Sequence, residues 1–345
     1  MTNRIRHLFI GPPLPTQQLA HERLNKIRAL ATFSPDALSS IAYANQEIYL
    51  GLLVAGSAGL ALAWPIALAI AGLLLLVALS YFQTIAGYPS GGGSYAVARK
   101  NLGTLPGLVA AAALLLGYLL TAAVSLTAGV EALASAFPAL WPYRVVVSLL
   151  LLAVITLLNL RGLREAGTLM AIPVYLFLSV FLSLLAYGLV RLWVEGPGLL
   201  PAVAPPPSEP LTVLLVLHTF SAGCTALTGI EAISNGVPAF DSPQVRNAQR
   251  TLVVMALLMG LLFLGSVGLT KSFAVVAGPE ETILSALTRR LVGSGPAHLL
   301  IQLSTMLILT VAANTSFAGF PRLVALLAKD GFLPRQLAGL GVRLV

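Results

Sequence analysis

Long stretches of this sequence contain no Asp, Glu, Lys or Arg, and they limit the fold more than any other feature. The longest runs from Ile48 to Ala98. A bilayer core about 30 Å thick is crossed by roughly 20 apolar residues of helix, so this run alone exceeds one span. Hydrophobic residues make up 57% of the chain and charged residues 9%, which would leave a water-soluble fold with large exposed apolar surfaces. The sequence therefore predicts an all-α membrane protein.

The charge-free runs predict about eight transmembrane helices, at residues 32–56, 61–86, 104–132, 143–160, 166–192, 211–238, 251–275 and 296–320. With this arrangement one side of the membrane receives fifteen of the twenty Lys and Arg residues; the other receives Arg144, Arg191, Lys271, Arg289 and Arg290. Because cytoplasmic loops are rich in Lys and Arg, both termini are expected in the cytoplasm. The same rule accounts for the net charge of +8, so the lipid bilayer, and not nucleic acid, is the expected partner.

Two internal matches share nearly one offset. Ala37–Ile41 matches Ala226–Ile230 at an offset of 189, and Ala96–Gly103 resembles Ala286–Gly293 at an offset of 190. By the loop charges, the two copies cross the membrane in opposite directions. Such inverted repeats are typical of secondary transporters with a central site.

The repeat suggests a division of the chain into four parts. We expect a cytoplasmic N-terminal segment, a first five-helix repeat, an incomplete second repeat of three helices, and a cytoplasmic amphipathic segment, at residues 1–30, 31–194, 195–320 and 321–345.

Two of the predicted spans look like poor continuous helices. Thr32–Asp36 and Ser39–Ser40 interrupt the first span, and Ser221–Thr225 and Thr228–Gly229 interrupt the sixth. In lipid, unwound backbone survives only where it lines a cavity or is buried in protein, and there it offers free carbonyl groups to a ligand. The alternative is two ordinary kinked helices, which Gly, Ser and Pro often produce.

Ionisable groups at membrane depth are costly and are therefore functional candidates; here they are Asp36, Glu47, Glu131 and Glu231. Asp36 and Glu231 flank the two repeat segments, which would bring one carboxylate from each half to the centre. Glu131 lies nearer the outer end of its span, and an ordinary surface role is expected for it.

Two polar stripes accompany these carboxylates. Residues 36, 43 and 47 are spaced so that Asp36, Tyr43 and Glu47 share a helix face if the break does not shift the phase. Tyr118, Thr121 and Ser125 form a polar stripe on an otherwise apolar span. The alternative for the second stripe is hydrogen bonding between membrane helices.

Carboxylate, phenol and hydroxyl oxygens together with free carbonyls describe a site for a hard monovalent cation. An amino-acid substrate is less suited, because its carboxylate would be repelled by Asp36. Proton coupling would fall to Asp36 or Glu231. His218 and His298 have no spaced partners for metal ligation, and the single Cys224 allows no internal disulfide.

Several strings resemble the amino acid-polyamine-organocation superfamily, and most closely its bacterial KimA-type potassium-proton symporters. They are Phe33–Tyr43, Tyr88–Tyr95, Thr225–Asn235, Ala313–Phe317, Phe320–Leu323 and Asp330–Arg335. The resemblance implies a LeuT-like core in a bacterial cell membrane and potassium uptake driven by protons, with no resident cofactor. It also places Asp36, Tyr43, Tyr118, Thr121, Ser125, Thr228 and Glu231 at the family's cation-site positions.

Members of this family have about twelve helices and a cytoplasmic domain that binds cyclic-di-AMP and helps them dimerise. This chain stops at Val345 after about eight predicted helices, so we expect a C-terminally truncated sequence that ends before the ninth, and a homodimer is a further expectation.

Three other functions stay open. A cationic amino-acid or polyamine permease of the same fold would use the carboxylates to hold an ammonium group. An intramembrane enzyme would use them for acid-base chemistry, but the sequence offers no plausible nucleophile-base pair or metal cluster. A channel would need a continuous pore in one conformation.

Overall fold

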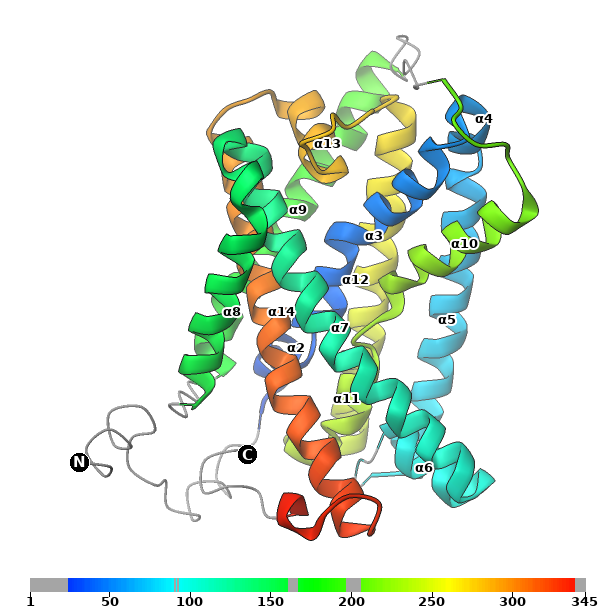
Figure 1. The fold of residues 1–345 in the computed structure, drawn as a ribbon, viewed down its shortest axis with the longest axis vertical. Coiled ribbons are helices and arrows are strands. Elements are labelled where there is room, and N and C mark those ends of the chain that lie inside the picture. The colour runs from blue at the N-terminus through cyan, green and yellow to red at the C-terminus, as the bar shows by residue number, and fades with distance from the viewer. Residues whose placement is uncertain (1–23, 90, 92, 161–166, 197–205, 339–345) are drawn as a thin grey trace, which may run out of the picture.

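The computed structural model describes residues 24–89, 91, 93–160, 167–196 and 206–338. Within these ranges the chain is a helical bundle (Figure 1), and its one β-bridge joins Leu24 and Phe240. The α-helices are α2 (Lys26–Phe33), α3 (Pro35–Leu53), α4 (Gly56–Leu60), α5 (Ala63–Gly87), α6 (Gly93–Leu102), α7 (Thr104–Ala136), α8 (Arg144–Leu160), α9 (Gly167–Glu195), α10 (Val213–Gly223), α11 (Glu231–Asn235), α12 (Gln244–Ser272), α13 (Ile283–Val292) and α14 (Pro296–Lys329). Short 3-10 helices are η2 (Pro138–Tyr143), η3 (Cys224–Leu227), η4 (Val237–Ala239) and η5 (Arg335–Ala338).

Six helical segments of the described chain are long and apolar enough to cross a membrane: Gly56–Gly87, Thr104–Ala136, Pro138–Asn159, Ala171–Glu195, Gln244–Ser272 and Pro296–Lys329. They coincide with six of the eight predicted spans. Large apolar side chains such as Leu75, Leu119, Leu150 and Leu257 are exposed on their outer faces, as expected where lipid is the solvent. The last segment continues to Lys329, beyond its expected end at residue 320, with Pro321 inside the helix.

The other two predicted spans, at 32–56 and 211–238, are each divided into shorter helices. The first consists of α2 and α3, and the second of α10, η3 and α11. Figure 1 shows α3 passing through the middle of the bundle. Most residues of α3 are buried, including the polar Asp36, Ser39 and Asn45, so this helix meets protein and not lipid on most of its surface.

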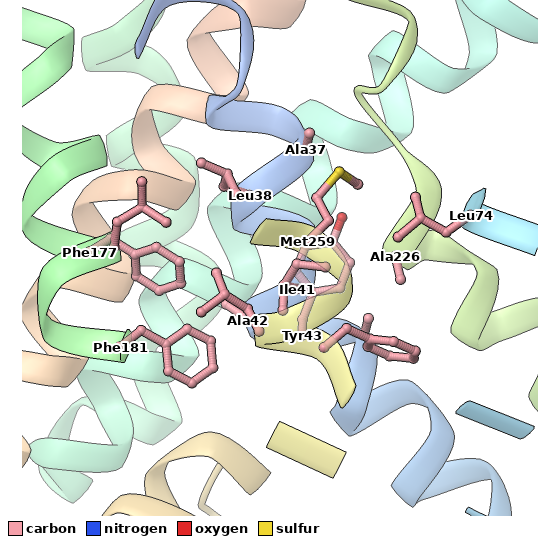
Figure 2. Close-up of a cluster of buried hydrophobic side chains, with 14 of the residues drawn as sticks. Ala37, Leu38, Ile41, Ala42, Tyr43, Leu74, Phe177, Phe181, Ala226 and Met259 are labelled. Carbon is pink, nitrogen blue, oxygen red and sulfur yellow. The ribbon is translucent and has the colours of Figure 1, made fainter. Parts of the chain in front are cut away.

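The main apolar core surrounds α3. Figure 2 shows Phe177 and Phe181 of α9 on one side of Leu38 and Ala42, and Leu74 of α5 and Ala226 of η3 on the other. All of these side chains are almost fully buried. Close packing of these side chains gives many favourable van der Waals contacts, which stabilise a helix that is surrounded by protein and not by lipid. The core therefore holds the two divided spans against each other.

The second internal match is also a structural correspondence. Helices α6 and α13 are both ten residues long and begin 190 residues apart. Each ends at a glycine with positive φ, at 99° for Gly103 and 76° for Gly293, whose N–H bonds the carbonyl of Arg99 or Arg289. Figure 1 places α6 at one end of the bundle and α13 at the other.

The predicted division into four parts stays a prediction. Residues 1–23 of the expected N-terminal segment and 339–345 of the expected final segment lie outside the described residues, as does the expected start of the fifth span at residue 166.

Candidate cation site

The first break is a kink centred on one residue. Helix α2 ends at Phe33, Ser34 joins the two helices with φ −99° and ψ −6°, and Pro35 begins α3. Proline has no N–H to donate and fits the first position of a helix, so it starts α3 and interrupts the hydrogen bonds that would continue α2. Asp36 then lies in the first turn of α3, where the helix dipole favours a carboxylate.

The prediction of a second interruption at Ser39–Ser40 is wrong. Both residues lie inside α3, and their hydroxyl groups donate to carbonyl groups three residues earlier. The Oγ of Ser39 lies 3.0 Å from the Asp36 carbonyl oxygen, and the Oγ of Ser40 lies 2.8 Å from that of Ala37. Serine satisfied within its own turn is compatible with a helix.

The second break is longer and confirms the sequence prediction. Helix α10 ends at Gly223, η3 covers the next four residues, and Thr228 is extended with φ −63° and ψ 149°. Gly229 follows with φ +81°, a conformation that favours glycine, and α11 starts at Glu231. The Thr228 hydroxyl donates to the Thr225 carbonyl at 2.9 Å.

The two breaks are in direct contact. A Cβ atom on Gly229 would lie 2.4 Å from the backbone nitrogen of Ala37 and 2.9 Å from the Cβ of Asp36, so no larger residue fits there. Glu231 lies close enough to Asp36 for its charge to act on the Asp36 carboxylate. The structure thus brings together the two carboxylates that the repeat placed at the centre.

Tyr43 lies about two turns further along α3 and is 6% exposed. It lies within electrostatic reach of Asp36 and close to Thr228, and the shared helix face stays a prediction. Glu47, the third member of that face, is partly buried and interacts electrostatically with Glu131 of α7.

The stripe on α7 approaches the same region. The Tyr118 hydroxyl lies within electrostatic reach of both Glu231 and Asp36, and its ring packs on Gly319 of α14. Thr121 and Ser125 are buried on α7. The place of these two hydroxyl groups in the site stays a prediction.

Several oxygens near the breaks are buried without a hydrogen-bond partner among the described residues. They are Asp36 Oδ1, Ser34 Oγ and Thr225 Oγ1. Most buried polar atoms in proteins have a partner, so these oxygens at the two breaks are candidate ligand atoms.

Sequence reasoning missed Tyr81 of α5. Its hydroxyl lies 2.9 Å from Ser94 Oγ and within electrostatic reach of Glu231. A single tyrosine in an apolar span has no spaced partner to mark it, so no sequence pattern points to its position.

A small cavity adjoins Tyr43 on the side toward α13. Gln46, Glu131, Thr282 and Thr305 also line it. Glu131 is partly buried beside this cavity, and its expected ordinary surface role stays a prediction. Thr282 and Leu284, at the start of α13, line part of the same cavity.

Among the described residues no group of three or more His, Cys, Asp and Glu side chains could hold a metal ion. His298 instead bonds the Ser285 hydroxyl at 2.8 Å, as expected for a hydrogen-bonded helix residue. The side chains at the breaks offer oxygen atoms, the ligand type that hard cations prefer.

Comparison with known proteins identifies the family. A family model described as amino acid permease matches residues 29–341. The chain belongs to the amino acid permease family. With its six apolar spans, this permease is a multi-pass membrane protein.

The permease is also similar to the potassium transporter KimA of Bacillus subtilis (strain 168). The two are 43% identical over 347 aligned residues, which cover this whole chain and 57% of that relative. The chain thus spans a little more than half the length of the relative. The descriptions of both the family and this relative are those of transporters.

Proposed function

We propose that this chain forms the core of a proton-coupled potassium importer that works by alternating access. The observation that carries the proposal is the contact between the two breaks, which joins Asp36 and Glu231 in one buried oxygen-rich centre. The similarity to a protein named as a potassium transporter supports the choice of ion.

The donor set suits potassium. Asp36, Tyr43, Thr228 and Glu231 offer carboxylate, phenol and hydroxyl oxygens from two helix breaks, and Tyr118, Thr121 and Ser125 would add oxygens from α7. Such a set replaces the hydration shell of a monovalent cation, as rings of carbonyl oxygens do in channels. The carbonyl ends of α2 and α10 also stop at the breaks, where their partial negative charge favours a cation.

The paired carboxylates provide a means of coupling. Two neighbouring carboxyl groups hold one shared proton more readily than two negative charges. A bound cation compensates the remaining negative charge, so one proton and one cation together neutralise the pair. Proton and potassium occupancy of the Asp36–Glu231 pair would then depend on each other. Both are cargo, and no resident cofactor is part of the proposal.

The proposed architecture is a LeuT-like core with eight membrane crossings, the six apolar spans plus the two divided ones. The matched helices α6 and α13 at opposite ends support the inverted repeat. The loop charges favour a cytoplasmic N-terminus in a bacterial cell membrane, which would make the α6 end cytoplasmic. A homodimer remains an expectation.

Uptake in a bacterial strain deficient in potassium transport tests the function. We use the full reading frame that contains this chain, and compare Asp36→Asn with Asp241→Asn as a matched control outside the site. Removing the central charge should reduce potassium uptake at least tenfold, since about 1.4 kcal/mol of lost binding suffices for that factor. Asp241→Asn should leave uptake unchanged. Normal uptake by an Asp36→Asn protein present at normal levels would refute the role of Asp36.

A cationic amino-acid or polyamine permease is the second candidate, because the matching family model is described as amino acid permease. Here the same two carboxylates would hold an ammonium group. Competition separates the candidates: excess rubidium should suppress potassium uptake, whereas excess arginine or putrescine should not. Uptake of radiolabelled arginine or putrescine that depends on Asp36, without uptake of potassium, would favour the second candidate.

A further inference from the structure

A polar cluster ties α6 to the end of α14. The Tyr95 hydroxyl donates to Asp330 Oδ2 at 2.7 Å, and Arg99 donates to the Tyr95 oxygen at 3.2 Å. Arg99 also forms an ion pair with Asp330. Its guanidinium carbon lies 5.3 Å from the centre of the Phe332 ring, within cation-π range. We call Tyr95, Arg99 and Asp330 the α6 latch.

Apolar packing fixes the latch in place. Tyr95 is 1% exposed and clusters with Ala111 of α7 and with Leu323 and Leu327 of α14. Tyr118, a candidate site residue, packs against the same cluster. The buried ring and the hydrogen bond from its hydroxyl to Asp330 hold α6 against α7 and α14.

The other face of α6 contacts different helices. The Ser94 hydroxyl lies 2.9 Å from that of Tyr81 on α5. A Cβ on Gly93 would lie 2.1 Å from the Oδ1 of Asn235, so α6 also touches α11. Helix α6 therefore joins α5 and α11, which hold Tyr81 and Glu231, to α7 and α14.

At the α6 end the helices fall into two groups, α7 with α14 and α5 with α12. Helix α14 packs most extensively against α7, whereas α5 packs most extensively against α12. A transporter that opens alternately at its two ends must separate such groups at one end at a time. Because α6 contacts both groups of helices, the two groups can separate at this end of the bundle only if α6 loses its contacts with one of them.

We propose that the α6 latch holds this end of the transporter closed, and that its release from Asp330 accompanies opening toward the α6 side. This inference rests on the proposed alternating-access function. The side chains of Arg99 and Asp330 are 36% and 26% exposed, so the ion pair is partly screened by solvent. A contact of modest strength suits a closure that must break in every cycle.

A distance measurement tests the latch. Spin labels are placed at Leu102→Cys on α6 and Gln336→Cys on η5, in a Cys224→Ser background of the full reading frame reconstituted in lipid nanodiscs. Pulsed electron paramagnetic resonance should give one main distance for the otherwise unmodified protein. Asp330→Asn should increase the longer-distance population about two- to fivefold, the range expected for a partly exposed ion pair. Tyr95→Phe should give a smaller increase in the same direction.

Two controls define the result. Lys329→Gln removes a neighbouring charge outside the latch and should leave the distances unchanged. The charge exchange Arg99→Asp with Asp330→Arg should restore the short distance, which a general loss of packing would not do. Tyr95→Phe keeps the buried ring, so it decides the question if Asp330→Asn fails to accumulate. Unchanged distances in the variants that accumulate would overturn the proposal.

The proposed function can fail separately. If the unmodified protein takes up no potassium, the transport proposal is refuted, while the distances still report whether Asp330 holds α6.

Discussion

Gly229 is the residue on which the contact between the two breaks depends. Its φ of +81° is unfavourable for residues with a Cβ, and the space beside it is occupied by the backbone of Ala37 and the side chain of Asp36. The glycine therefore allows the second break to approach the first.

Gly229→Ala should separate Asp36 from Glu231. The left-handed conformation alone costs about 1 to 2 kcal/mol for a residue with a Cβ, and the close contact with Ala37 adds to this. We expect a lower thermal unfolding midpoint and at least a tenfold loss of potassium uptake. Gly117→Ala is the matched control, because its Cβ would meet no atom within 4 Å and should change neither measurement. Full uptake by Gly229→Ala would show that the close approach is unnecessary.

At the same scale, the sequence predicted charged residues better than hydroxyl groups. Asp36 and Glu231 stand out because charge at membrane depth is costly, and the structure places them together. The predicted break at Ser39 and Ser40 is wrong, because each hydroxyl bonds a carbonyl group of its own helix. Tyr81 was missed because nothing local distinguishes it from a lipid-facing tyrosine.

At the scale of helices, the sequence match between α6 and α13 predicts their local structure but not their tertiary contacts. Their equal lengths and matching terminal glycines follow from residues 96–103 and 286–293, which the repeat had paired. The latch of α6 could not be predicted, because Tyr95 and Asp330 are 235 residues apart and meet only through tertiary packing.

The latch should be insensitive to pH near neutrality. The hydrogen bond from Tyr95, followed by the contact with Arg99, holds the pKa of Asp330 below its ordinary 3.8. A lowered carboxyl pKa means that this stabilisation is present above 3.8 and is lost only as the pH falls through the lowered value. Burial and Asp330 raise the pKa of Tyr95 above 10, so its hydroxyl remains a donor.

The spin-label distance between α6 and η5 should therefore stay constant from about pH 8 to about pH 5, well above the range in which Asp330 titrates. The neighbouring charged side chains are Lys329, the preceding residue on α14, and Arg335 on η5. A distance that lengthens between these two pH values would show that another titrating group controls α6.

For the whole molecule, composition and loop charge predicted the fold class and the six apolar spans. The two divided spans were located as well, because Pro35 and Gly229 mark their breaks. The exact packing of α7 and α14 beside them depends on shape complementarity between apolar surfaces, which hydrophobic periodicity does not specify.

The central claim is that two contacting helix breaks bind one dehydrated monovalent cation through Asp36 and Glu231. Titration calorimetry of the purified full-length protein with potassium chloride tests it most directly, with sodium chloride, arginine and putrescine as competitors. We predict saturable potassium binding that is tighter than the binding of sodium, arginine or putrescine. Asp36→Asn should weaken potassium binding at least tenfold. Binding of an amine in place of potassium, or potassium binding of equal strength in the Asp36→Asn protein, would contradict the claim.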